Sequence, residues 1–225
     1  MQPLCMPRSS RAIVAEHCYH VVNRGNNQQE LFHDRADYVA FLWLIAEANE
    51  RVSLPIIGGC VMPNHVHLIV RPQHDTQVAE WTHWLFTTHA RRYHKKYASS
   101  GRVWQGRFKA FVIQDDEHLL SVLRYVERNA LRASLADRAE AWEWGSLRWR
   151  TSGSAPFALA PSPVPLPENW IAYVNTPQTP DEIEAIRICA RRQSPFGATE
   201  WSANKAVEFG IEETLAPIGR PRKRM

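Results

Sequence analysis

The sequence lacks closely paired cysteines and long apolar runs. Its four cysteines are far apart and include no C-x-x-C pair, so neither a zinc knuckle nor a disulfide framework is indicated, and a reducing cytoplasm is expected. The most apolar stretch, residues 39–46, is far too short to span a bilayer, and the first eleven residues contain no apolar core of a signal peptide. We therefore expect a cytoplasmic protein that makes no membrane contact.

The sequence also lacks a Gly-x-x-x-x-Gly-Lys phosphate loop and internal repeats, which excludes the common P-loop nucleotide site and repeat architectures. Its 225 residues, 44% of them hydrophobic, are enough for a normal core, and a formal charge of +4 favours a polyanionic partner. Five prolines between residues 156 and 167 mark a change of composition. We predict a domain over residues 1–150, a proline-rich linker over 151–180 and a helical extension with a basic tail over 181–225.

Hydrophobic periodicity predicts four strands and three helices. Their order indicates an α+β fold, a ferredoxin-like βαββαβ sandwich with an antiparallel sheet, followed by a third helix. We expect the helices on one face of the sheet, which leaves the other face, or the sheet edge under the third helix, open for a substrate. The strands lie near residues 17–24, 54–61, 64–70 and 107–113, and the helices begin after Asp34, after Thr76 and at Asp115 or Asp116, the last one running to about Ala133.

The His65-Val66-His67 run is the centre of the predicted site. Because strand side chains alternate between the two faces, His65 and His67 point the same way while Val66 enters the core. Two imidazoles held on a rigid sheet can supply two nitrogen ligands to a divalent metal. A polar, half-exposed strand face is the alternative interpretation. His20 on the first strand is a further candidate beside the pair.

Tyr125 and Asn129 lie four residues apart on the third helix, so they share one of its faces. A phenol and an amide on one face can both meet a substrate. The alternative is that Tyr125 seals the edge of the core and Asn129 is solvated near the helix end, and spacing alone favours this second interpretation.

Basic and aromatic residues gather in the last turns of the second helix and in the segment that follows it. This mixture suits the phosphates and unstacked bases of a single strand, although a solvated helix end with cations near its C-terminal dipole is equally consistent. Trp104 either stacks on a base or plugs the edge of the sheet, and residues 219–224 form a basic tail similar to AT-hook peptides. The candidate nucleic-acid contacts are Arg24, Arg91, Arg92, Lys95, Lys96, Trp104, Arg107, Lys109, Arg220, Arg222, Lys223 and Arg224.

Four stretches resemble the HUH single-tyrosine transposases, named for their His-hydrophobic-His motif, and more narrowly the IS200-like, REP-associated tyrosine transposases of bacteria. They lie in the family's order within the first 135 residues. The chain departs from the family at residues 130–131, where Ala-Leu replaces the usual Pro-Val. The matching stretches are 19–27, 62–70, 103–109 and 124–129, and residues 194–197 and 219–223 are similar to the family's tail.

The resemblance implies a site, a reaction and a partner. His65, His67 and Asn129 would hold a divalent ion, Mg²⁺ or Mn²⁺. Tyr125 would attack single-stranded DNA and form a 5′-phosphotyrosine link with release of a 3′-OH. The resemblance therefore implies a monomeric or homodimeric enzyme that nicks and joins hairpin-forming palindromic repeats.

Two other functions fit the sequence. The basic segments are consistent with a DNA-binding or regulatory module that keeps the scaffold and does not cleave. A metallohydrolase could use the histidines to activate water, but no third histidine or carboxylate ligand stands near the motif.

Overall fold

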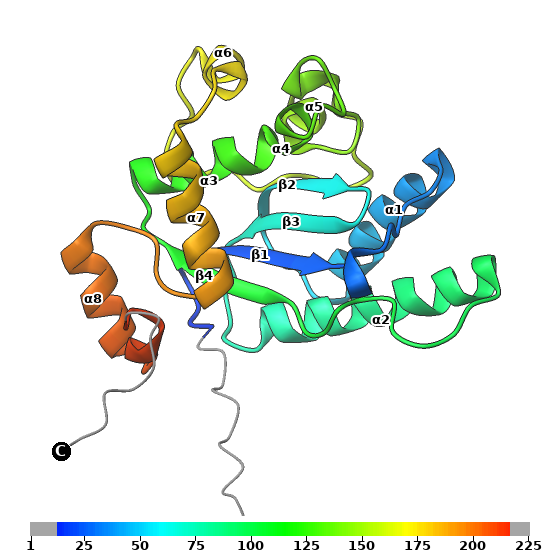
Figure 1. Cartoon of the computed structure of the whole chain (residues 1–225), viewed down its shortest axis with the longest axis horizontal. Helices are drawn as coiled ribbons and strands as arrows, with labels where there is room; N and C mark the ends of the chain where they lie inside the picture. The colour runs from blue at the N-terminus through cyan, green and yellow to red at the C-terminus, as the bar shows by residue number, and fades with distance from the viewer. Residues whose placement is uncertain (1–12, 217–225) are drawn as a thin grey trace, which may run out of the picture.

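The structure, a computed structural model, describes residues 13–216 (Figure 1). Four antiparallel strands form one sheet: β1 (Cys18–Arg24), β2 (Ile56–Met62), β3 (His65–Val70) and β4 (Lys109–Ile113). Their spatial order is β2-β3-β1-β4, which is the order of a ferredoxin-like sandwich. The predicted fold class and the predicted succession of strands and helices are therefore confirmed.

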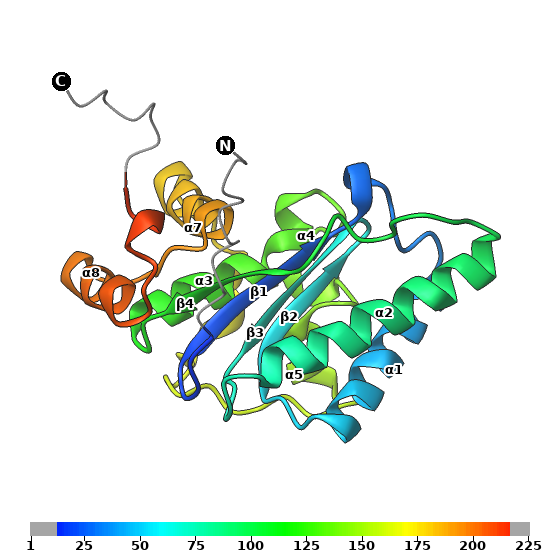
Figure 2. The same cartoon turned by 90° about the horizontal axis from the view of Figure 1, so that it is seen from below.

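Two long helices cover one face of the sheet, α1 (Arg35–Arg51) between β1 and β2 and α2 (Gln77–Tyr97) between β3 and β4, and Figure 2 shows them side by side. α1 begins after Asp34 as predicted, and a capping box closes its first turn: the Asp34 carboxylate accepts from the Asp37 N–H at 3.0 Å, and the Asp37 carboxylate accepts from the Asp34 N–H. α2 begins after Thr76, but the Thr76 side chain makes no capping hydrogen bond. Neither helix, nor any other within residues 13–216, is both long and apolar enough to cross a membrane.

The two helices of the βαββαβ unit therefore lie on one face as expected, but the opposite face, which was expected to stay open, is covered as well. α3 (Glu117–Glu127) packs there against β2 and β3. The close approach is possible because Gly58 of β2 has no side chain, and a Cβ atom there would lie 2.5 Å from Cδ1 of Leu123. The sheet therefore separates two apolar clusters, one under α1 and α2 and the other under α3.

The third predicted helix is shorter than expected. α3 ends at Glu127, and a separate turn, α4 (Asn129–Arg132), follows it. The intervening Arg128 has φ −83° and ψ −3°, and its guanidinium donates to the carbonyl oxygens of Asn175 (2.6 Å) and Val174 (3.3 Å). The helix is thus interrupted at the residue whose side chain binds the backbone of a later segment.

The C-terminal part of the chain packs on this second face. Trp170 and Ile186 are buried in the apolar cluster under α3. The proline-rich segment is attached as well, because the Ala160 N–H donates to the Ile56 carbonyl at 2.7 Å. The boundaries at residues 150 and 180 stay a prediction, and the segment between them lies on the domain. The helices of this part are α5 (Ser146–Ser152), α6 (Trp170–Asn175), α7 (Pro180–Arg192) and α8 (Thr199–Glu208), and 3-10 turns occupy Asn26–Gln28, Ala139–Ala141 and Glu212–Thr214.

The Glu127 carboxylate connects α3 to this C-terminal part. Its side chain is completely buried and accepts hydrogen bonds from the Ser146 hydroxyl (2.6 Å), Trp170 Nε1 (2.7 Å) and Arg150 Nε (3.2 Å). A buried charge is unfavourable unless it is paired and hydrogen-bonded, and these three donors meet that requirement. Glu127 therefore fixes the end of α3 against α5 and α6.

We expect Glu127→Ala to lower the free energy of unfolding by about 3 kcal/mol, because the partly buried Arg150 and the buried Trp170 N–H lose their acceptor. Urea denaturation measures the loss. The matched control is Glu143→Ala, which removes a solvent-exposed partner of Arg35 and should cost less than about 1 kcal/mol. Equal losses in the two variants would contradict the role given to Glu127.

Candidate active site

His65 and His67 lie next to each other on the face of β3 that is directed toward α3. The residues of β1 opposite them are Arg24 and Val22. The centroids of the two imidazole rings are 4.8 Å apart, and the ring planes are nearly perpendicular, at 87°. Val66 between them is buried in the other cluster, under α1 and α2. The predicted alternation therefore holds, and the two ring nitrogens can approach one point.

Burial keeps both imidazoles neutral. Burial, with smaller effects of the Arg24 and Arg132 cations, lowers the pKa of His65 from its ordinary 6.5 to about 4. The pKa of His67 is lowered well below the ordinary value, first by burial and then by His65 and His20. A neutral imidazole offers a nitrogen lone pair, which is the form that a metal ion requires.

His20 on β1 constrains His67. Its Nε2 lies 2.7 Å from Nδ1 of His67, and the two rings are stacked with centroids 4.9 Å apart. If the shared proton belongs to His67 Nδ1, then His67 Nε2 keeps a free lone pair. If the proton belongs to His20, then His67 Nε2 is itself protonated and cannot bind a metal. A metal ion at His67 Nε2 would therefore require the tautomer in which His67 donates to His20.

Tyr125 and Asn129 approach the imidazoles from α3 and α4. The Tyr125 ring centroid is 6.0 Å from that of His67 and 6.5 Å from that of His20, and Asn129 Nδ2 lies 3.5 Å from Nε2 of His65. Tyr125 is 7% exposed and lines a cavity. The structure thus brings together the four side chains that the sequence selects, while their roles stay predictions.

Arg132, which has no predicted role, holds both Tyr125 and Asn129 in place. Its Cζ lies 4.1 Å from the centroid of the Tyr125 ring, and its guanidinium donates to Asn129 Oδ1 (2.9 Å) and to the Tyr125 carbonyl (3.3 Å). The spacing of three and seven residues from Asn129 and Tyr125 places all three on one side of the helix, and this is the signal that could have identified Arg132.

The side chains of the site line a cavity of about 620 Å³. Six of its lining residues are cations, and none is a carboxylate, so the cavity suits an anion. Arg24, Arg107 and Lys109 are predicted nucleic-acid contacts, and the structure places all three here. The other three cations, Arg132, Arg187 and Arg191, have no predicted role, and the last two come from α7. No local spacing relates α7 to the histidine pair, so a single sequence could not reveal this contribution.

A family model described as "Transposase IS200 like" matches residues 13–129, slightly more than half of the chain. The chain belongs to the IS200-like transposase family. The match includes the histidine pair, Tyr125 and Asn129, and it ends before the later helices of this IS200-like transposase.

Two further relatives are informative. A Haemophilus influenzae protein described as a REP-associated tyrosine transposase is 30% identical over 108 residues. That match covers 43% of this chain and 61% of the relative. A solved structure of a REP-associated tyrosine transposase bound to a REP hairpin has a TM-score of 0.52 at 16% identity, over 69% of this chain and 93% of that chain. The second similarity shows a shared fold.

The predicted contacts on α2 of this IS200-like transposase do not line the cavity. Lys96 forms ion pairs with Asp34 (2.7 Å) and Asp37 (2.6 Å), so its charge is neutralised by the start of α1. The other three are exposed and lie in the last turns of α2. They are Arg91, Arg92 and Lys95.

Trp104 fills the end of the sheet, and this corrects the prediction that it contacts DNA. It is 7% exposed and packs against Phe86, His89 and Phe41, with ring centroids 4.6, 5.2 and 6.2 Å away. A ring enclosed in this way has no face for a base. The predicted tail contacts lie outside the described residues; they are Arg220, Arg222, Lys223 and Arg224.

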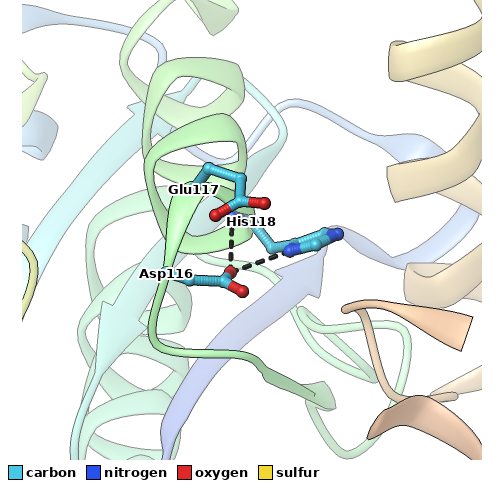
Figure 3. A group of neighbouring side chains, drawn as sticks. All are labelled: Asp116, Glu117 and His118. Atoms are coloured by element: carbon cyan, nitrogen blue, oxygen red, sulfur yellow. Dashed lines mark hydrogen bonds and ion pairs between the residues drawn. The ribbon is translucent and has the colours of Figure 1, made fainter. Parts of the chain in front are cut away.

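A second group of possible metal ligands lies at the start of α3, where Asp116, Glu117 and His118 are close together (Figure 3). The Asp116 carboxylate already accepts from the His118 N–H (2.9 Å) and from His118 Nδ1 (2.8 Å), so it serves as a helix cap. Glu117 precedes Tyr125 by eight residues, or roughly 12 Å of helix. This group is therefore separate from the histidine pair.

We expect His20→Phe to weaken Mn²⁺ binding by roughly 10-fold to 100-fold, because His67 loses the partner that fixes its ligand-competent tautomer. Isothermal titration calorimetry or the Mn²⁺ electron paramagnetic resonance signal measures the affinity. The control is His89→Phe, which replaces another buried histidine outside the cavity. Unchanged Mn²⁺ affinity in His20→Phe would refute the assignment.

We expect the free energy of unfolding to decrease as the pH is lowered below about 6.5. Burial lowers the pKa of His20 to about 3 and those of His65 and His89 to about 4, whereas the unfolded chain protonates these groups near 6.5. The unfolded state therefore binds more protons between these values, and each group removes up to about 1.4 kcal/mol per pH unit. Thermal melts in metal-free buffer at a series of pH values measure the effect, and the Tm should decrease as the pH is lowered. His89→Phe should show a shallower dependence, and a pH-independent Tm would contradict the argument.

Proposed function

We propose that the chain is a metal-dependent endonuclease and strand transferase for single-stranded DNA, with Tyr125 as the nucleophile. The observation that carries the proposal is the convergence of Tyr125, His65 and His67 on a cavity lined by six cations and no carboxylate. A phosphodiester is an anion that repels nucleophiles of the same charge. A cavity with this charge lets the phosphate approach the phenol.

The donor set fits a divalent ion, and His65, His67 and Asn129 would hold it. The two imidazoles are neutral at pH 7, and an amide oxygen with two nitrogens favours Mg²⁺ or Mn²⁺ over a closed zinc site. Asn129 directs its nitrogen toward His65 and its oxygen toward Arg132, so the amide must turn to offer its oxygen. When bound, the ion would polarise the scissile phosphate and offset charge that develops in the transition state.

The reaction that we propose forms one bond and breaks one. The Tyr125 phenol gives up its proton and its oxygen bonds to phosphorus. The bond from phosphorus to the 3′ oxygen breaks, and that oxygen takes up a proton and leaves as a 3′-OH. A 5′-phosphotyrosine remains, which preserves a phosphodiester. The 3′-OH of a second strand can therefore reverse the step and join, without an external energy source. Arg132, stacked on the Tyr125 ring, supplies positive charge beside both the phenol and the phosphate.

Hairpin-forming repeats are the substrate class that we propose. The relative from Haemophilus influenzae is described as REP-associated, and the solved structure that shares the fold holds a REP hairpin. Arg24, Arg107 and Lys109 line the cavity, and their positive charges would contact the phosphates of the strand. The exposed cations of α2 are available for the stem.

Incubation with a labelled single-stranded hairpin repeat and Mn²⁺ should give a covalent adduct on a denaturing gel. Tyr125→Phe should abolish the adduct because the nucleophilic oxygen is gone. Tyr93→Phe is the matched control, since this partly exposed phenol on α2 lies outside the cavity, and it should keep the adduct. An adduct in Tyr125→Phe at the wild-type level would show that the nucleophile is misassigned.

The same assay separates the two other functions. DNA binding without an adduct across metals and repeats would favour a regulatory module. Cleaved products with no attached protein would favour a metallohydrolase that activates water.

A further inference from the structure

We infer that α7 forms part of the nucleic-acid surface, and that Arg187 and Arg191 bind backbone phosphates of the strand in the catalytic cavity. That the ligand is a DNA strand rests on the proposed function. The role of α7 goes beyond the family match, because the match ends at residue 129 and α7 begins at Pro180.

Arg187 and Arg191 share one face of α7, since they are four residues apart. Both are exposed, and both line the cavity together with His65 and Tyr125. On the other side of the helix, Ile186 is buried in the apolar cluster under α3. α7 cannot turn the two arginines away from the cavity without exposing this apolar side.

Hydrogen bonds before and after α7 hold it against the elements that carry the site. Before the helix, the Arg124 guanidinium of α3 donates to the carbonyl oxygens of Thr176 (2.7 Å) and Pro177 (3.1 Å). After it, Phe196 donates to the Val112 carbonyl of β4 at 2.9 Å. Figures 1 and 2 both show α7 beside β4. The arginines are therefore preorganised, which lowers the entropic cost of binding a phosphate.

The charges around α7 point to an anion that is not part of the protein. Arg187 forms no salt bridge within residues 13–216, although its charge, together with the larger effect of Arg191, helps to lower the pKa of Glu184. The charge of Arg187, after the larger effect of burial, contributes to a lowered pKa of Arg132. Arg191 is paired on its own helix with Glu184 at 2.6 Å. Glu184 lies outside the lining of the cavity, which holds six cations and no carboxylate. Like charges gathered in this way repel one another and destabilise the compact state unless an anion joins them.

Fluorescence anisotropy with a short labelled oligothymidylate tests the inference, and all proteins carry Tyr125→Phe so that no cleavage is needed. Binding is measured over a series of salt concentrations. Arg187→Ala with Arg191→Ala should weaken binding about tenfold at low salt and reduce the slope of log K against log salt by about 1.4, because each phosphate contact contributes about 0.7. Arg148→Ala, an exposed arginine of α5 outside the cavity, is the matched control and should leave the slope unchanged.

Glu184→Gln should not weaken DNA binding, in contrast to the double arginine variant. It releases Arg191 from its acid, so the oligothymidylate should bind at least as tightly as before. Weaker binding in Glu184→Gln, or an unchanged slope in the double arginine variant, would overturn the inference. Failure of the proposed function is distinct: the wild-type chain then forms no adduct with the hairpin substrate, whatever the arginine variants do to binding.

Discussion

The antiparallel pairing of β1 with β3 is the constraint on which the site depends. In this register Val22 stands opposite His67 and His20 opposite Ile69, and the rings of His20 and His67 stack on the face that α3 covers. A slip of one residue would turn the β3 imidazoles into the cluster under α1 and α2. The register is secure because Val66, Leu68 and Val70 are buried on that other face.

Burial of apolar side chains stabilises the fold around the site, whereas repulsion among the cations of the cavity destabilises it. The proposed site needs both the buried histidines and the cations. Enclosure by α3 removes His65 and His67 from water and keeps them neutral, which suits a ligand. The cavity beside them is lined by six cations from β1, β4, α4, α7 and the loop before β4, and no acid is among its lining residues. The apolar contacts of α3 and the hydrogen bonds of Glu127 compensate for this repulsion. The site is therefore held in place in part by side chains outside it, such as Glu127 and the apolar residues of α3.

Local patterns predicted much of this structure, and long-range contacts account for what they missed. Alternation along a strand is enough to direct His65 and His67 to one face, and helical spacing is enough to align Tyr125 with Asn129. The interruption at Arg128 depends on carbonyl oxygens near residue 175, far along the chain. The contribution of α7 (Pro180–Arg192) likewise depends on its contact with β4 (Lys109–Ile113), which lies far earlier in the chain. Trp104 shows a further limit, because sequence cannot tell whether an aromatic ring beside basic residues is enclosed.

Backbone bonds also cover the two outermost strands. On β4 the pairing partner is Phe196, which accepts from Gln114 and donates to Val112, both at 2.9 Å. On β2 the Val61 N–H donates to the Trp144 carbonyl at 2.8 Å, and the Ile56 carbonyl accepts from Ala160. Unpaired amides on a border strand are a template for recruiting another polypeptide. These short segments occupy that template on both sides, so the sheet resists amyloid-like growth and self-association by strand addition.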